Sequence, residues 1–152
     1  MLLDSHLVPQ TILRRGSFVG LMALYESNYL RLLRLIPEIA RLDGCFRSRV
    51  AGDCDLHVDV LERCRYTVTL SLTYYFHTDE GLLVDPDMTV RVYLDGQLAE
   101  AMAIGQQQRH GALRDIVREH HSELDMRWQR NCVLNKWLEY LSDSGHLVLE
   151  RQ

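Results

Sequence analysis

The middle of the chain shows a long alternation of apolar and polar positions. In RYTVTLSLTYYF (65–76), every second residue from Tyr66 to Phe76 is aliphatic or aromatic, and each residue between them carries a hydroxyl group. An alternation of this length is typical of an antiparallel strand with one buried face. Shorter patterns predict two further strands, in FRSRVAG (46–52) and DLHVDVLER (55–63).

The segment PDMTVRVYLDGQLAEAMA (86–103) predicts two strands joined by a tight turn. In the first strand, apolar residues lie on one face and polar residues on the other. Asp95-Gly96 is typical of a two-residue type I′ turn, because both central residues of that turn need a positive φ. The preceding stretch HTDEGLLVDPD (77–87) is predicted to be a polar connection.

Helical spacing of apolar residues predicts a helix near each end of the chain. The first helix begins after Ser17, a favourable N-cap residue, and ends at Ile36, before a proline. The second covers DMRWQRNCVLNKWLEYLSDSG (125–145), where Gly145 suits the C′ position. A short helix is also predicted in ALRDIVREHHSEL (112–124). The apolar side of the second helix comprises Trp128, Val133, Leu134, Trp137, Leu138 and Leu141.

Helices at both ends of a run of antiparallel strands predict an α+β fold. We expect an antiparallel sheet of four to five strands, with the N-terminal and C-terminal helices packed on one face. Residues 1–15 are expected to form a flexible or docking arm, and residues 16–152 a single domain. The predicted core comprises Leu70, Leu72, Val90, Val92, Leu134 and Leu138.

Composition narrows the class of protein. The chain has 152 residues, of which 47% are hydrophobic and 25% charged, as is usual for a soluble globular domain. The net charge is -4, and neither half of the chain is strongly basic. Nucleic acid is therefore not an expected partner. No apolar run approaches the roughly 20 residues needed to cross a membrane, and the N-terminus lacks a signal-peptide pattern. These features predict a cytoplasmic protein without membrane contact.

Motifs of known catalytic and cofactor sites are missing from the sequence. There is no G-x-S-x-G turn, no phosphate-binding glycine loop and no dinucleotide fingerprint. Acidic pairs such as Asp85 and Asp87 lie in predicted turns, where little desolvation is expected. We therefore expect no catalytic residue and no cofactor.

Metal-binding residue types occur, but with unsuitable spacing. The candidate ligands that cluster in the sequence are His110, His120, His121 and Cys132. The two adjacent histidines would point about 100° apart on a helix, which disfavours a shared ion. His57 and Asp59 share one predicted strand face and could begin a site. The four cysteines form no C-x-x-C pair, so we expect free thiols and no metal.

The candidate binding residues lie on the polar faces of two predicted strands. They are Thr67, Thr69, Thr89, Arg91 and Tyr93. If these strands are neighbours, hydroxyl groups, a guanidinium and a phenol meet on one surface. Such a surface suits a small anionic ligand or the carboxylates of a protein partner. The alternative is an ordinary solvated sheet face, because all these residues are good strand formers.

Four blocks of sequence resemble, in order, those of the YqiB-like family of small bacterial proteins, which carry a domain of unknown function. The blocks are YESNYLRLLRLIP (25–37), RYTVTLSL (65–72), PDMTVRVYLDGQLAE (86–100) and NKWLEYLSDSGH (135–146). The resemblance implies a shared type of domain and no particular chemistry. Family genes often neighbour those of a cyclic-AMP phosphodiesterase and an ADP-ribose pyrophosphatase, which hints at a role in nucleotide metabolism or signalling. Residues 105–126 match poorly, and their role stays open.

Taken together, these features predict a non-catalytic binding or regulatory protein that acts through protein–protein contact. One alternative is a small-ligand module, with a nucleotide as one candidate ligand, and another is an enzyme with an unrecognised site. A deep pocket at the polar face would favour the ligand module. A buried cluster of histidine and acidic residues would favour the enzyme. The sequence leaves the partner, the ligand and the oligomeric state open.

Overall fold

The computed structural model, which describes residues 17–104 and 123–149, is an α+β fold, as predicted. Its elements follow in the order α1 (Phe18–Leu35), β1 (Cys45–Ser48), β2 (Asp55–Arg63), β3 (Thr67–Thr78), β4 (Gly81–Tyr93), β5 (Leu98–Ile104) and α3 (Glu123–Asp143). The strands form an antiparallel five-stranded sheet in sequence order, β1-β2-β3-β4-β5. The predicted arm 1–15 and most of the helix predicted over 112–124 lie outside the described residues.

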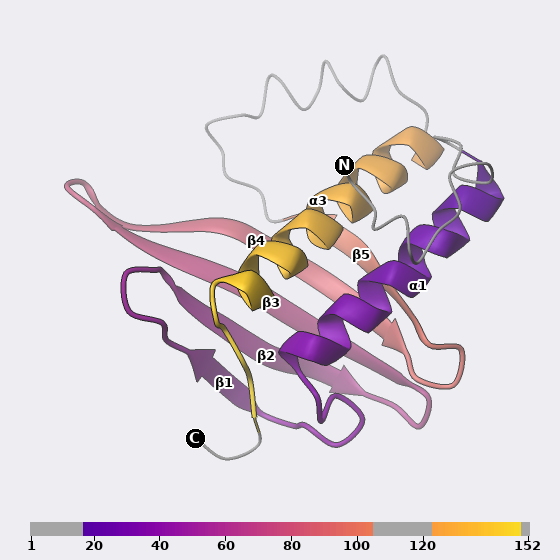
Figure 1. Cartoon of the computed structure of the whole chain (residues 1–152), viewed down its shortest axis with the longest axis horizontal. Coiled ribbons are helices and arrows are strands. Elements are labelled where there is room, and N and C mark those ends of the chain that lie inside the picture. The colour runs from indigo at the N-terminus through magenta and orange to yellow at the C-terminus, as the bar shows by residue number, and fades with distance from the viewer. Residues whose placement is uncertain (1–16, 105–122, 150–152) are drawn as a thin grey trace.

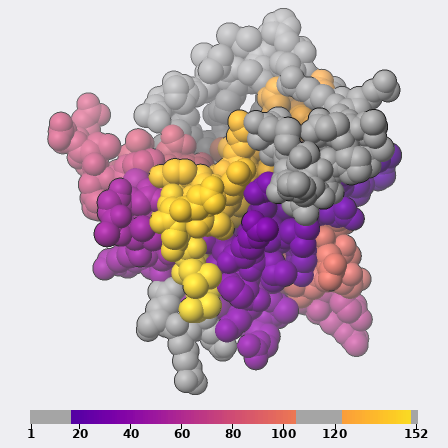
Figure 2. Space-filling model, in the orientation of Figure 1, coloured from indigo at the N-terminus to yellow at the C-terminus, as the bar shows by residue number. Residues whose placement is uncertain are grey.

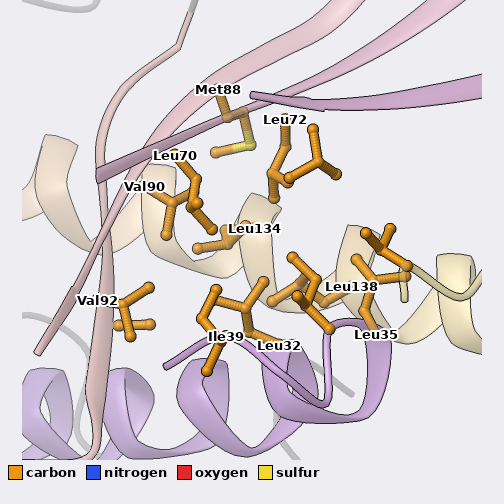
Figure 3. Packing of buried hydrophobic residues seen from close by; sticks show 14 of the residues in the cluster. Leu32, Leu35, Ile39, Leu70, Leu72, Met88, Val90, Val92, Leu134 and Leu138 are labelled. Atoms are coloured by element: carbon orange, nitrogen blue, oxygen red, sulfur yellow. The ribbon is translucent and has the colours of Figure 1, made fainter. Parts of the chain in front are cut away.

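Both described helices pack on the same face of the sheet (Figure 1), as predicted. The six residues of the predicted core all belong to one buried cluster between helices and strands, and each is fully buried (Figure 3). Seen from the helix side, α1 and α3 hide much of the sheet, and the β3–β4 hairpin projects beyond them (Figure 2). We call this side the covered face and the opposite side the open face.

The predicted helix ends have a local cause. The Ser17 side chain accepts a hydrogen bond from the Gly20 N–H at 3.0 Å and so caps α1. After α3, Gly145 adopts a φ of 97°, a conformation that glycine tolerates well. The chain then turns back, and the His146 N–H donates to the Leu141 carbonyl at 3.0 Å. This turn directs the C-terminal segment toward β1.

Buried asparagines join the two helices to the outer edge of β5. Asn28 donates to the Ala99 carbonyl at 3.2 Å, and Asn131 accepts from the Ala101 N–H at 2.7 Å. Asn28 also donates to Asn131 at 3.1 Å, and Asn135 donates to Asn28 at 3.1 Å. Because β5 is an edge strand, these amides take the place of a neighbouring strand and satisfy its backbone groups.

A turn lies at Asp95-Gly96 as predicted, but the predicted type I′ is wrong. The connection covers four residues, 94–97, and Gln97 rather than Gly96 has a positive φ, 58°. The hydrogen-bond ladder between β4 and β5 ends before Leu94, because the Leu94 N–H donates instead to the carbonyl of Tyr66, in the turn between β2 and β3, at 2.8 Å. The pairing of β4 with β5 still starts at Tyr93 and Leu98, which is the register that the two-residue turn predicts.

The prediction of a polar connection over 77–87 is also wrong, because most of this stretch belongs to β3 and β4 and lengthens their hairpin. Sequence reasoning treats a proline as a strand breaker. Here Asp85 and Pro86 together oppose the single residue Tyr74, at a shift in the register. A bulge of this kind leaves a residue outside the ladder, so the missing N–H of proline costs no strand hydrogen bond.

Two smaller predictions also need correction. The strand predicted over 46–52 ends at Ser48, because the chain then turns and the Asp53 N–H donates to the Val50 carbonyl at 3.1 Å. Val133, which the helical spacing predicts on the apolar side of the second helix, is 45% exposed. The four cysteines carry free thiols, as predicted. Neither described helix is long and apolar enough to cross a membrane.

Candidate functional site

The structure places all five predicted binding residues together on the open face. Thr67 lies directly opposite Tyr93, and Thr69 lies directly opposite Arg91, in the antiparallel pairing of β3 with β4. Thr89 is the next open-face residue of β4 and lies opposite Ser71. The premise that these two strands are neighbours is therefore confirmed.

Glu100 on β5 joins this group, although sequence analysis did not include it. Glu100 pairs with Arg91 across the strands and accepts a hydrogen bond from the Tyr93 hydroxyl at 2.5 Å. Burial raises the pKa of Tyr93, and Glu100 raises it further, while Arg91 opposes the shift. The sequence held a signal for this residue, because the predicted hairpin register already sets Glu100 opposite Arg91. We call Arg91, Tyr93 and Glu100 the arginine group.

The hydroxyl-bearing residues of β3 form a continuous line along the open face. We call Thr67, Thr69, Ser71 and Thr73 the hydroxyl row. The Ser71 and Thr73 hydroxyls lie 3.3 Å apart, and Thr73 donates to Asp87 at 3.0 Å. The sequence placed Asp87 in a turn, but it is a partly buried open-face residue of β4.

The β2 side of the open face carries His57 and Asp59, which share one face as predicted. The His57 ring meets the Tyr75 ring edge-on at 4.3 Å between centroids. Burial lowers the pKa of His57, and the charge of Arg47 lowers it further, which favours the neutral ring. Among the described residues, no group of three or more histidine, cysteine or acidic side chains could hold a metal ion. His110, His120 and His121 lie outside these residues.

A second polar group, which sequence analysis missed, lies around the buried His146 at the C-terminal end of α3. His146 Nδ1 lies 2.9 Å from Ser48 Oγ, and His146 Nε2 lies 3.1 Å from Asp53 Oδ2. Tyr74 donates to the same Asp53 oxygen at 2.6 Å, and Tyr140 donates to Asp53 Oδ1 at 3.3 Å. We call these five residues the histidine cluster. No local motif pointed to it, since Ser48 and His146 are 98 positions apart.

The carboxylate of Asp53 is the centre of the histidine cluster. Burial alone would raise the pKa of Asp53, but hydrogen bonds from Tyr74, the Cys54 N–H and His146 together hold it below its ordinary value. Burial raises the pKa of Tyr74, and the bond to Asp53 adds to that shift. The cluster therefore keeps an ionised carboxylate whose two oxygens both accept hydrogen bonds.

The order serine, histidine, aspartate resembles a catalytic triad, but the geometry does not offer a reaction site. Ser48 is only 5% exposed, and its hydroxyl oxygen accepts a hydrogen bond from the Leu147 N–H at 3.2 Å. The His146 side chain is fully buried. A nucleophile needs access to a carbonyl carbon and donors for the developing oxyanion. The histidine cluster instead fastens the C-terminal segment to β1, β3 and the β1–β2 turn.

A small cavity lies on the helix side, between the C-terminal ends of α1 and α3. Its volume is about 20 Å³, and its lining includes Arg31, Arg34 and Ser142. Arg31 also lies 3.7 Å from Glu139. A cavity of this size holds about one water molecule. It is too small for a metabolite.

Comparison with known proteins identifies relatives but no chemistry. Residues 31–147 match the sequence profile of a family described as "Protein of unknown function (DUF1249)". The chain is 30% identical over 134 residues to "Uncharacterized protein YqiB" of Escherichia coli (strain K12). The aligned region covers 87% of this chain and 93% of the relative. The same protein of Escherichia coli O157:H7 matches equally well. No solved structure matches.

Proposed function

This chain belongs to the YqiB-like family of proteins of unknown function (DUF1249), and we propose that it is a non-catalytic binding protein that contacts another protein through its open face. One observation carries the proposal. Both described helices pack on the same side of the sheet, which leaves a broad face of five strands without a described helix over it (Figure 1). The free thiols support a cytoplasmic location.

The shape of this face favours a protein over a small molecule. Small ligands bind in concave sites that bury most of their surface. The open-face residues instead extend from strand to strand, with Thr67, Thr69, Thr89 and Arg91 all only partly buried. The small cavity described above lies on the other side of the molecule, among helix residues.

The charges of this face weigh against the alternative of a small anionic ligand. Arg91 lies opposite Glu100, and Asp87 and Asp59 share the same surface. These carboxylates would repel a phosphate or nucleotide. A thermal-shift screen with nucleotides tests this alternative directly, since a bound nucleotide raises the midpoint temperature by mass action.

The proposal is tested by comparing capture of partners on two surfaces. Immobilised wild-type chain, Arg91→Ala, Tyr93→Ala and Arg34→Ala are each exposed to lysate of the producing organism. Arg34→Ala is the matched control, because Arg34 is an exposed arginine on α1, outside the open face. We expect a partner retained by wild type and control, with affinity reduced about ten- to a hundredfold in the two open-face variants. Equal retention by all four proteins would contradict the proposal.

A further inference from the structure

We propose that the partner lays an extended segment with lysine or arginine side chains along the hydroxyl row of the open face. This inference rests on the proposed function and adds the chemistry of the partner. It follows from the arrangement of small and acidic side chains on the face, whereas the sequence alone suggested a surface suited to a small anionic ligand or a partner's carboxylates.

The hydroxyl row is a track of small side chains on the central strand of the sheet. It runs from Thr67 to Thr73 on β3, with two strands on either side. This length corresponds to about 20 Å, the span of six or seven extended residues. Hydroxyl groups donate and accept hydrogen bonds, so the row suits the backbone and short side chains of an extended segment.

Acidic side chains flank the hydroxyl row on both sides. On β2, Asp59 lies opposite Ser71, and Glu62 lies opposite Thr69. On β4, Asp87 lies opposite Thr73. The Thr73 hydroxyl donates a hydrogen bond to one of the two carboxylate oxygens of Asp87. Within residues 17–104 and 123–149, Asp59, Glu62 and Asp87 form no ion pair.

The basic groups of the open face do not neutralise these carboxylates. Arg91 lies on β4, opposite Thr69 on one side and Glu100 on the other, and it interacts with Tyr93. Arg47 lies on β1, at the edge of the sheet, opposite His57. The track beside Asp59 and Glu62 therefore has an excess of negative charge.

The spacing of the acidic groups favours a peptide over a single cation. In an extended chain, side chains on one face repeat about every 7 Å, which equals the repeat along β3. Lysine or arginine side chains from such a segment can reach the carboxylates on both flanks while its backbone lies over the hydroxyls. Charged groups placed in this way steer association and fix the register of the partner.

The test uses a synthetic peptide of roughly eight residues with alternating lysine and serine, matched to the length of the row. The same peptide with glutamate in place of lysine is the negative control. Binding to the full chain is measured by titration at low salt, and the bound surface is mapped from amide chemical shifts. The variant Asp59→Asn/Glu62→Gln removes two open-face charges. The control Glu26→Gln/Asp143→Asn removes two exposed charges from the helices.

We expect the lysine peptide to bind, with shifts centred on β2, β3 and β4, and to lose about three- to thirtyfold in affinity in the open-face variant alone. The inference is wrong if the lysine peptide does not bind, if both double variants weaken it equally, or if the shifts lie on the helices. A captured protein that needs Arg91 and Tyr93 but binds Asp59→Asn/Glu62→Gln like wild type would keep the proposed function and reject only the basic segment.

Discussion

The two faces of the sheet differ in what their side chains are paired with. On the covered face, Leu70, Leu72 and Val90 are fully buried against helix residues, and buried asparagines satisfy the edge of β5. On the open face, half-buried polar residues bond mainly to one another, as Tyr93 does to Glu100. The covered face therefore supplies most of the buried contacts that stabilise the fold, whereas substitutions on the open face should change stability less.

The largest expected effect comes from deleting side-chain volume on the covered face. Leu72→Ala should lower the free energy of unfolding by about 2 to 5 kcal/mol, because it loses burial and leaves a cavity. The side chain of the neighbouring Ser71 points to the open face, so Ser71→Ala is the matched control. Chemical denaturation of both variants measures the difference. An unchanged midpoint for Leu72→Ala would remove the distinction between the faces.

Removing a hydrogen bond from the histidine cluster should lower the free energy of unfolding, as a substitution on the covered face does. Tyr74→Phe removes a hydrogen bond to the ionised Asp53 and should cost about 1.5 to 3 kcal/mol at neutral pH. The pKa of Asp53 is lowered in the folded state, so its contribution is fully present above the ordinary pKa of 3.8 and is lost as the pH falls through the folded value. Denaturation at neutral and acidic pH should show the two proteins converging in acid.

The asparagines test whether the edge of β5 belongs to the covered face. Asn131→Ala leaves the Ala101 N–H and the Asn28 amide without this acceptor and should cost about 1 to 3 kcal/mol. Lys136→Ala, at an exposed position of the same helix, should be close to neutral. A comparison of midpoints decides the matter. Equal stability of the two variants would show that water replaces the asparagine at no cost.

Much of this fold could be predicted because its signals are local. The alternation along β3 and the helical spacing after Ser17 each depend on neighbouring residues, and both elements formed as expected. The bulge at Pro86 could not be predicted, because it depends on which residues of the opposite strand it meets. The histidine cluster was hidden for the same reason, since His146 meets residues of β1 and β3 only after the chain has folded.

The candidate site was predictable in its position but not in its charge. Alternation along two strands was enough to place Arg91 and Tyr93 on one face with the threonines. The hairpin register predicts Glu100 on this face, but the rest of its acidic character depends on the register of β2, which brings Asp59 and Glu62 to the same surface. The sequence-based suggestion of an anionic ligand or a partner's carboxylates therefore took account of Arg91 but not of the acidic residues on the same surface.

A pH titration sharpens the comparison on the open face. The pKa of His57 is lowered below its ordinary value of 6.5 in the folded state, first by burial and then by Arg47. Between the two values the unfolded chain binds more protons, so stability is present above pH 6.5 and decreases as the pH falls through the folded pKa. We expect His57→Gln to show a smaller loss of stability over this window. A steeper loss in the variant would mean that the pKa of His57 is raised.

The smallest expected effect belongs to the hydroxyl row. Thr69 is only partly buried and lies opposite Arg91, with no helix residue above it in the described part of the chain. Thr69→Ala should therefore change the free energy of unfolding by no more than about 0.5 kcal/mol. The neighbouring Leu70→Ala, one residue along but on the covered face, is the control for large loss. Calorimetry of the isolated chain and of the chain with the lysine peptide separates two roles for the threonine. A small effect on stability together with weaker peptide binding supports a contact surface, because the hydroxyl then acts only when a partner is present. A loss above about 1 kcal/mol in the isolated chain would show that the open face is itself packed against something, and the two faces would no longer differ in kind.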